Sequence, residues 1–165
     1  MAIFALILKI LHVLSAMALV AGIVGRQMAR SQAQKATDIN FFVELTSLAG
    51  RFESRLVIPG SNLVALFGLI LALLQGWPVI GFLQGAKQNW LLVSNLLLLS
   101  MILVIPLIFA PRGKLFDAAL KDAVARGEIT PQLTSRFTDP VVNAAHRWEE
   151  FALAAIIILM VAKPF

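Results

Sequence analysis

The sequence predicts an all-α protein, a four-helix transmembrane bundle with amphipathic cytoplasmic helical segments. Apolar residues make up 59% of the 165 positions and charged residues 14%, and the mean hydropathy is +0.87. Soluble domains carry about 25% charged residues, so water is a poor solvent for this chain. Four apolar runs follow one another: Ile3–Val24, Leu56–Leu74, Trp90–Ala110 and Phe151–Ala162. We therefore expect a single four-helix integral membrane domain over residues 1–165.

The lengths of these runs match a lipid bilayer. About 20 residues of helix are needed to cross a hydrocarbon core of about 30 Å, and the first three runs are close to that length. We expect Ile3–Val24 to be a retained helix and not a signal peptide, because the apolar region of a signal peptide would not contain Lys9 and His12. The fourth run spans the core only if it is extended back to Val141. That extension contains five polar residues, which must face protein, water or headgroups: Asn143, His146, Arg147, Glu149 and Glu150.

The basic residues predict the orientation of the helices. Eleven of the 14 Lys and Arg residues lie in two segments, Arg26, Arg30, Lys35, Arg51 and Arg55 in the first, and Arg112, Lys114, Lys121, Arg126, Arg136 and Arg147 in the second. The loop 76–89 contains only Lys87. By the positive-inside rule, residues 27–55 and 112–140 face the cytoplasm and both termini face outward. The net charge of +5 therefore indicates a membrane orientation and no nucleic-acid partner.

Both basic segments contain helical patterns. Asp38 is a candidate N-cap for a helix that runs into the second span, where Pro59 removes a backbone hydrogen bond and bends the helix. After the third span, apolar residues recur at helical spacing from Leu115 to Val124. This pattern is typical of a helix that lies on the membrane surface or against a partner. Gly127 ends that helix, and Thr130 and Asp139, each followed by proline, begin the next two.

Lys9, His12, Ala16 and Leu19 lie along one stripe of the first helix, which we expect to face the inside of the bundle. Lys9 and His12 are three residues apart and are therefore neighbours on one face. His12 has two interpretations at this stage. It either forms a structural hydrogen bond to a carbonyl or to Asn95 of a neighbouring helix, or it serves a cofactor as a haem ligand or proton carrier.

The second histidine begins the fourth helix among charged residues. We expect a structural ion-pair cluster here, with Arg147 and Glu150 as an i, i+3 pair and Arg51 or Arg55 as further members. The alternative, a metal site at His146, has too few ligands to be complete, and we expect no metal. His146 lies about 12 Å deeper than His12, which argues against one haem held by both histidines. The absence of cysteine excludes disulfides and thiolate sites.

Short motifs along the chain resemble two families of small bacterial four-helix membrane proteins. They are Leu8-Lys9-Ile10-Leu11-His12-Val13 with Ala21-Gly22, then Arg55 with Ile58-Pro59-Gly60 and Gly68, and the ending Val161-Ala162-Lys163-Pro164-Phe165. One family is the uncharacterised predicted integral membrane family (domain of unknown function 2269). The other is the HemJ-type protoporphyrinogen oxidase, with the copper-resistance-D membrane domain as a more distant relative. The resemblance covers most of the chain and implies a multi-pass protein of the bacterial cytoplasmic (inner) membrane.

For a HemJ-like protein the resemblance implies an oxidase that removes hydrogen from protoporphyrinogen. It also implies b-type haem bound through a first-helix histidine and a third-helix lysine. His12 matches the histidine, but no lysine follows Trp90, where the chain reads Leu91-Leu92-Val93-Ser94-Asn95-Leu96. Gly25-Arg26-Gln27-Met28 stands where these oxidases often have another histidine. The uncharacterised family fits better, and it implies a membrane fold without a reaction.

The sequence therefore leaves two possible functions. The first is an accessory or structural subunit of a membrane complex, without a complete catalytic site, in contact with lipids and with other subunits or a second copy. The second is a b-type haem- or porphyrin-binding redox protein centred on His12, with Lys9 as the other candidate cofactor-binding residue.

Overall fold

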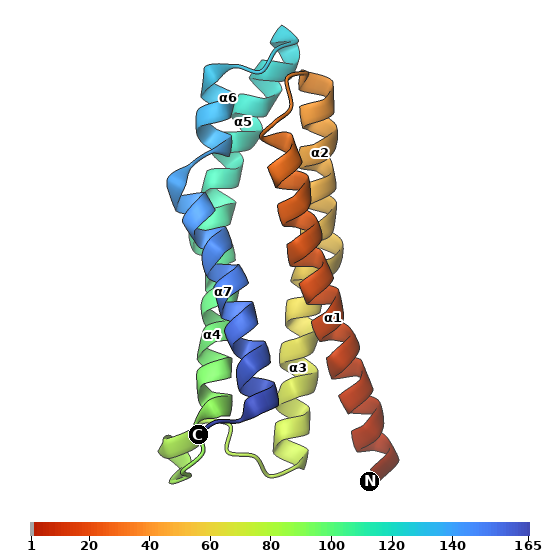
Figure 1. Cartoon of the computed structure of the whole chain (residues 1–165), viewed down its shortest axis with the longest axis vertical. Helices are drawn as coiled ribbons and strands as arrows, with labels where there is room; N and C mark the ends of the chain where they lie inside the picture. Colours follow the sequence, from red (N-terminus) through yellow and green to blue (C-terminus); the bar gives the residue numbers. More distant parts are fainter. Residues whose placement is uncertain (1) are drawn as a thin grey trace.

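The computed structural model describes residues 2–165, and all regular structure in that range is helical (Figure 1). The first two long helices are α1 (Ala2–Ala33) and a continuous helix made of α2 (Ile39–Phe52), the π-helical turn η1 (Glu53–Val57) and α3 (Ile58–Leu74). A third continuous helix consists of α4 (Trp90–Val104), the π-helical turn η3 (Ile105–Phe109) and α5 (Ala110–Arg126). The short helices η2 (Gly81–Gln84) and α6 (Pro131–Phe137) lie in connections, and α7 (Pro140–Ala162) completes the chain.

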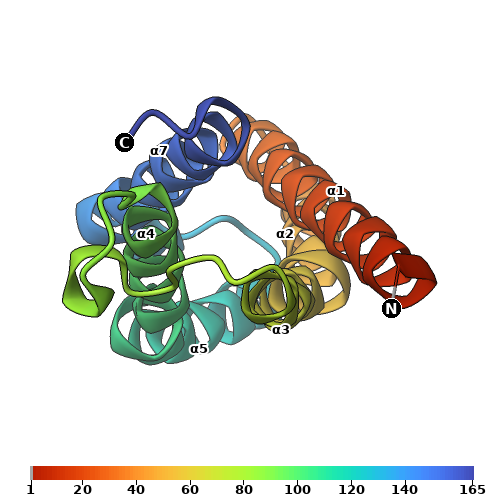
Figure 2. The same ribbon diagram turned by 90° about the horizontal axis from the view of Figure 1, so that it is seen from below.

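The helices form a membrane-protein bundle. Three continuous helices are long and apolar enough to cross a membrane, namely Ala2–Ala33, Ile39–Leu74 and Trp90–Arg126. The fourth, α7, has 23 residues and carries Arg147, Glu149 and Glu150 in its first half. Figure 2 shows α1, α3, α4 and α7 around the long axis of the bundle. The predicted all-α bundle is thus confirmed as three candidate spans and a fourth helix packed beside them.

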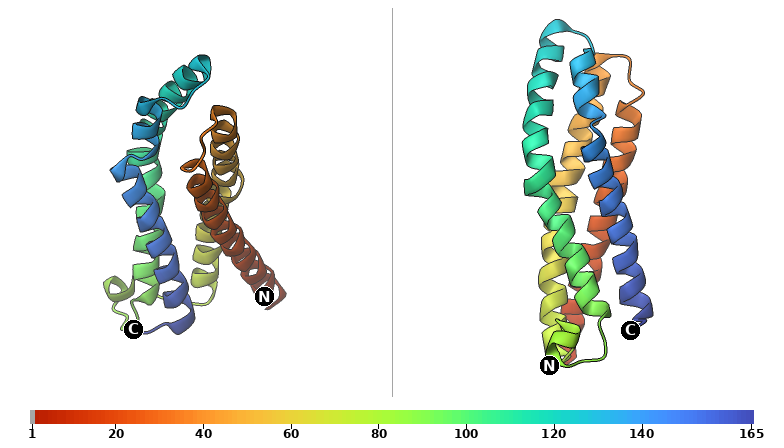
Figure 3. Two further views of the ribbon diagram at one scale, coloured as in Figure 1. Left: turned by 45° about the horizontal axis from the view of Figure 1, so that its top comes forward. Right: turned by 90° about the vertical axis from the view of Figure 1, so that its left-hand side faces the viewer.

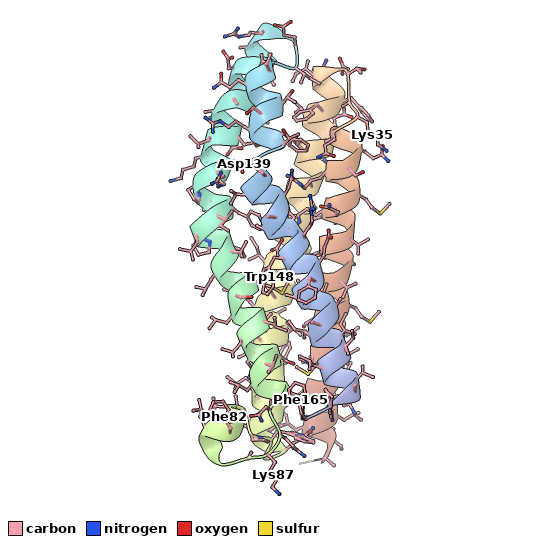
Figure 4. All side chains as sticks on the ribbon, turned by 60° about the vertical axis from the view of Figure 1, so that its left-hand side comes forward. Lys35, Phe82, Lys87, Asp139, Trp148 and Phe165 are labelled. Atoms are coloured by element: carbon pink, nitrogen blue, oxygen red, sulfur yellow. The ribbon has the colours of Figure 1, made fainter. Side chains whose placement is uncertain are left out.

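The two ends of the bundle differ. The termini end contains both chain termini and the connection 75–89, and the far end contains the connections 34–38 and 127–139 (Figures 1 and 4). At the termini end, the N–H groups of Asn89 and Trp90 both donate to the Phe165 oxygen at 3.0 Å. The Lys163 ammonium lies 4.7 Å from the Trp77 ring centre and 5.3 Å from that of Trp90. These contacts hold the C-terminal tail against the start of α4.

The amphipathic segment after the third span differs from its sequence-based prediction. It is not a separate helix, because α5 continues α4 through η3 in one helix. In this turn the Ala110 N–H donates to the Ile105 carbonyl, five residues back. Such π-helical turns shift the hydrogen-bond register, which lets a helix continue past prolines such as Pro106 and Pro111. Ala119 and Ala123 of α5 are buried in the chain, whereas Leu115 and Val124 of the same apolar pattern are exposed.

The region before Pro59 also contains a π-helical turn. The segment from Asp38 runs into the second span as expected, and η1 ends two residues before the proline. Here the Ile58 N–H donates to the Glu53 carbonyl, so the helix stays continuous through the site of the predicted bend. The predicted helix ends are confirmed: Asp38 accepts from the Phe41 N–H, Thr130 from Leu133, and Asp139 from Val141. Gly127 ends α5 with a φ of 73°.

The bundle consists of two halves (Figure 3, left). One half is α1 packed on α2, η1 and α3, and the other is α4, η3 and α5 packed on α6 and α7. Three apolar clusters join them, and the one at the termini end is Ala72, Trp90, Leu91 and Leu159. The other two lie farther along the bundle. The first, at the far end, is Ala33, Ile39, Phe42, Ala119, Ala123, Leu133 and Phe137. The second, near the middle, is Leu19, Ile23, Val57, Met101 and Ala152.

Two glycines offer a matched test of packing within the first half. A Cβ on Gly22 would lie 2.8 Å from the Leu56 Cβ and 3.0 Å from the Val57 backbone nitrogen, whereas a Cβ on Gly50 meets nothing within 4 Å. Gly22→Ala should therefore lower the free energy of unfolding by about 1–3 kcal/mol, because backbone atoms must move apart. Gly50→Ala should raise it by up to about 1 kcal/mol through helix propensity. Thermal unfolding in one detergent compares them, and equal shifts of the same sign would contradict the close approach.

Candidate functional site

A cavity of about 860 Å³ lies between the two halves, in the part of the bundle nearer the termini end. Its walls come from α1, α3, α4 and α7 and are mostly apolar. The few polar residues on the walls are Lys9, His12, Gln75, Ser94, Asn95 and Lys163. Ligand pockets in proteins usually measure about 300–1,000 Å³ and combine apolar walls with a few placed polar groups. By size and lining, this cavity suits a large apolar ligand.

His12 is held on the cavity wall by α3. Its Nδ1 lies 3.0 Å from the Val64 carbonyl oxygen. A carbonyl only accepts, so this contact puts the imidazole proton on Nδ1 and leaves the lone pair on Nε2. Within residues 2–165, Nε2 has no hydrogen-bond partner. Histidines that bind metals show this arrangement, in which the second ring nitrogen donates to a carbonyl or carboxylate.

Gly68 makes this position of His12 possible. A Cβ at Gly68 would lie 2.8 Å from the His12 Cε1, so only glycine lets the ring lie this close to α3. Asn95, the other partner considered from the sequence, instead donates to the Val79 carbonyl at 3.3 Å. The structural hydrogen bond and the cavity position of His12 therefore occur together. The two interpretations of this histidine do not exclude each other.

The rest of the stripe on α1 lines the same cavity. Lys9, Ala16 and Leu19 all contribute to its walls, and Lys9 is exposed at the side nearer the termini end. Ser15 lies on the neighbouring face, buried, with its hydroxyl donating to the Leu11 carbonyl at 2.8 Å. The two sequence-predicted cofactor-binding residues, Lys9 and His12, are thus brought to one cavity.

A buried ionic cluster lies nearer the far end and joins the two halves. Arg26 of α1 is 4% exposed and Glu149 of α7 is 1% exposed. One Arg26 Nη donates to the carboxylate of Glu53 in η1, and the other donates to the Glu149 Oε2 at 2.5 Å. The same Oε2 lies 3.3 Å from the His146 Nδ1. The His146 ring also stacks on Phe109, with ring centres 4.5 Å apart.

The main role of the cluster is to hold α1 to η1 and α7 through ion pairs. Burying a charge is costly unless it is paired, and here one guanidinium serves two carboxylates from different elements. Within residues 2–165, no three His, Asp or Glu side chains converge as a metal site requires. His12 lines the cavity of about 860 Å³, whereas His146 lines a different one, of about 380 Å³, together with Arg26 and Glu53. The two histidines therefore belong to different sites.

The ion-pair cluster forms from other residues than those predicted. Arg51, Arg55 and Arg147 are exposed, Glu150 is half-buried, and none of the four takes part in an ion pair among residues 2–165. The reason is the orientation of α7 about its own axis, which decides which residues face the bundle. Its buried face follows Ala145, Glu149, Ala152 and Leu159, so Glu149 points inward and Glu150 does not. The alanines four residues before and three residues after Glu149 were a signal for this face in the sequence.

A second interhelical pair fixes the start of α7. Arg112 of α5 donates to the carboxylate of Asp139, which also accepts the N–H groups of Val141 at 2.8 Å and Val142 at 3.3 Å. Desolvation opposes ionisation of Asp139, but these two N–H groups and Arg112 outweigh it and hold its pKa below the ordinary value. Figure 4 shows Asp139 between Trp148 and the far end.

This lowered pKa predicts a pH dependence. Because the folded state binds the Asp139 proton more weakly than the unfolded state, its stabilisation is fully present above the ordinary carboxyl pKa of about 3.9. It is lost as the pH falls through the lower folded value. Asp139→Asn, which keeps an N-cap acceptor, should cost about 0.5–1 kcal/mol at neutral pH and nothing in strong acid. Unfolding curves of both proteins across this range test it, and a difference independent of pH would contradict it.

The comparisons with known proteins concern the whole bundle. No curated protein and no solved structure matches the chain. One family model, described as predicted integral membrane protein (DUF2269), matches residues 6–164. That range contains the His12 cavity, the ionic cluster and all the long helices except the first residues of α1. The chain therefore belongs to the DUF2269 family of predicted integral membrane proteins.

Proposed function

We propose that this protein binds a haem- or porphyrin-class ligand in the cavity beside His12, as a redox component of the bacterial cytoplasmic membrane. The observation that carries the proposal is the imidazole of His12, which is fixed through Nδ1 to the Val64 carbonyl on the wall of a cavity of about 860 Å³. Its Nε2 is thereby left as a neutral nitrogen ligand. The first helix also resembles that of HemJ-type oxidases, and this resemblance supports His12 as the residue that binds the ligand.

The cavity fits such a ligand in size and in charge. Its apolar walls suit a flat macrocycle, and Lys9 and Lys163 at the side nearer the termini end suit the carboxylates that natural porphyrins carry. No lysine follows Trp90 on α4 as it does in HemJ-type oxidases, and Ser94 and Asn95 are the polar residues of this helix that line the cavity. His12 is therefore the one histidine of this cavity that could hold the iron of such a ligand. A haem bound here would supply a redox-active iron.

The topology that we propose follows the positive-inside rule. Both termini and the connection 75–89 face outward, and the far end faces the cytoplasm, because the Arg- and Lys-rich segments lie at or near that end. A C-terminal reporter fusion tests this orientation. We expect activity from a reporter that works only outside the cytoplasm, and activity confined to a cytoplasmic reporter would reverse the proposed topology.

An accessory or structural subunit is the second candidate function. The buried ion pair between Arg26 and Glu149 favours it, since pairing across the two halves gives these charges a structural use without any ligand. Such a subunit would contact lipids and other membrane subunits or a second copy of this chain.

A titration distinguishes the two candidates. The purified protein in neutral detergent is titrated with haem and, separately, with metal-free protoporphyrin, while the absorption spectrum is recorded. We expect haem to saturate at one equivalent and to bind more tightly than the metal-free ring, because only haem gains the bond to His12. If haem partitions into the protein no better than into empty micelles, the ligand-binding proposal fails and the accessory role is favoured.

A further inference from the structure

A second cavity, which we call the arginine cleft, lies near the far end between the two halves. It has a volume of about 380 Å³ and is partly open. Its walls are mostly apolar and come from α1, α2, η1, α3, η3, α5, α6 and α7. Four arginines reach it: Arg26, Arg30, Arg112 and Arg136.

The carboxylates near the arginine cleft do not balance these four cations. Arg26 is paired with Glu53 and Glu149, and Arg112 is paired with Asp139. Neither Arg30 nor Arg136 has a carboxylate partner among the described residues. Four guanidinium groups and three carboxylates leave one net positive charge at the cleft, and Arg30 and Arg136 are the two cations without an ion pair.

Arg30 is the less exposed of these two. It is half-buried, and its Nη2 contacts only the Phe137 carbonyl and the Asn143 side-chain oxygen, both at 3.4 Å. Those contacts are long beside the usual N–H···O distance of about 2.9 Å. A guanidinium has five N–H donors, and most of those of Arg30 remain available. The guanidinium also lies 4.7 Å from the centre of the Phe137 ring, which orients it.

The cleft lacks acceptors as well as negative charge. Arg30 and Arg136 both line it, and neither has an ion pair among residues 2–165. Withdrawing a charge from water is costly unless the charge is paired and hydrogen-bonded. The arginine cleft thus combines surplus positive charge with unused N–H donors of Arg30, and an anion supplies what both lack.

The depth of the cleft indicates what kind of anion it takes. Arg30 lies six residues beyond Val24, where the first apolar run ends, which is a rise of about 9 Å. The headgroup layer extends about 5–8 Å beyond the hydrocarbon core on each side, and the Arg30 side chain leans back toward it because helical side chains point toward the N-terminus. We propose that the arginine cleft binds an anionic phospholipid, with the phosphate against Arg30 and Arg136 and the glycerol and first acyl carbons against Phe109. This site is separate from the His12 cavity and does not depend on the proposed function.

Lipid binding to the full chain tests the proposal. The protein in neutral detergent is studied by native mass spectrometry and thermal unfolding with added phosphatidylglycerol, phosphatidylcholine or inorganic phosphate. We expect phosphatidylglycerol to bind and stabilise the protein most. Arg30→Gln and Arg136→Gln should each weaken its binding about fivefold, as expected for one basic residue near an anionic lipid. Arg51→Gln, an exposed arginine on α2 outside the cleft, should leave it unchanged.

The alternative outcomes are distinct. Equal binding of phosphatidylglycerol and phosphatidylcholine, or wild-type affinity in both cleft variants, overturns the proposal. Stabilisation by inorganic phosphate as large as that by the lipid would show a free-anion site instead and also overturns it. Arg136 is exposed, so Arg136→Gln keeps the test valid even if Arg30→Gln fails to fold.

Discussion

Replacing Arg26 by methionine should lower the free energy of unfolding by about 3–5 kcal/mol, the largest stability effect we expect from one substitution. Arg26 is the only cation paired with Glu53 and Glu149 among residues 2–165. Its loss leaves Glu149, 1% exposed, with His146 as its only polar partner. Breaking a buried pair by removing one partner usually costs this much, because the other charge stays buried and uncompensated. Chemical denaturation in one detergent measures the loss.

Two neighbours of the cluster serve as matched controls. Arg147→Met and Glu150→Gln change residues without ion pairs on the same helix turn, and each should shift stability by less than about 0.5 kcal/mol. Adding Glu149→Gln to Arg26→Met should recover part of the loss, since the uncompensated charge is then removed. A double-mutant cycle gives the coupling between the two sites. Equal losses from Glu149→Gln and Glu150→Gln would contradict the inward position of Glu149.

The second large effect is on ligand affinity. His12→Ala should weaken haem binding by more than about 100-fold, since even outer-shell partners of metal ligands are worth about 10–100-fold. The fold should survive, because the half-buried imidazole contributes a single hydrogen bond of about 1 kcal/mol. Spectroscopic titration measures the affinity, and thermal unfolding of the ligand-free protein measures the fold.

A nearby residue provides the control for this effect. Ser15→Ala removes a buried hydroxyl of α1 that bonds only to its own helix, outside the cavity wall, and should leave haem affinity unchanged. Free imidazole should restore part of the spectrum of the His12→Ala variant by occupying the place of the side chain. Haem affinity at the wild-type level in His12→Ala would show that the ligand, if bound, does not use this residue.

The elements of the fold were largely predictable from local sequence. The apolar runs located the helices because a bilayer demands about 20 apolar residues per span. Asp38, Thr130 and Asp139 located helix starts because their side-chain oxygens satisfy the first N–H groups. The continuation of α4 into α5 was missed, since the apolar run ends at Ala110 and a π-helical turn leaves no clear sequence signal.

The site was predictable in part. Lys9 and His12 stood out because polar residues are rare in a span, and the structure places both on one cavity. The partner of His12 was not predictable, since a backbone carbonyl such as that of Val64 leaves no mark in the sequence. Near the start of the fourth helix the structure has ion pairs of Glu149 and not of the expected Arg147 and Glu150. Glu149 and Glu150 differ by one residue, or about 100° around the helix, and Ala145 and Ala152 were the only signal in the sequence for the face that Glu149 shares.

Anomalous X-ray scattering at the iron edge, from crystals of the haem-saturated protein, tests the central claim most directly. The account predicts one iron peak per chain, inside the cavity between α1, α3, α4 and α7, within bonding distance of the His12 Nε2. The His12 Nδ1 should remain hydrogen-bonded to the Val64 carbonyl. An iron peak elsewhere in the bundle, or a cavity that holds only lipid chains while haem stays in the detergent, would contradict it.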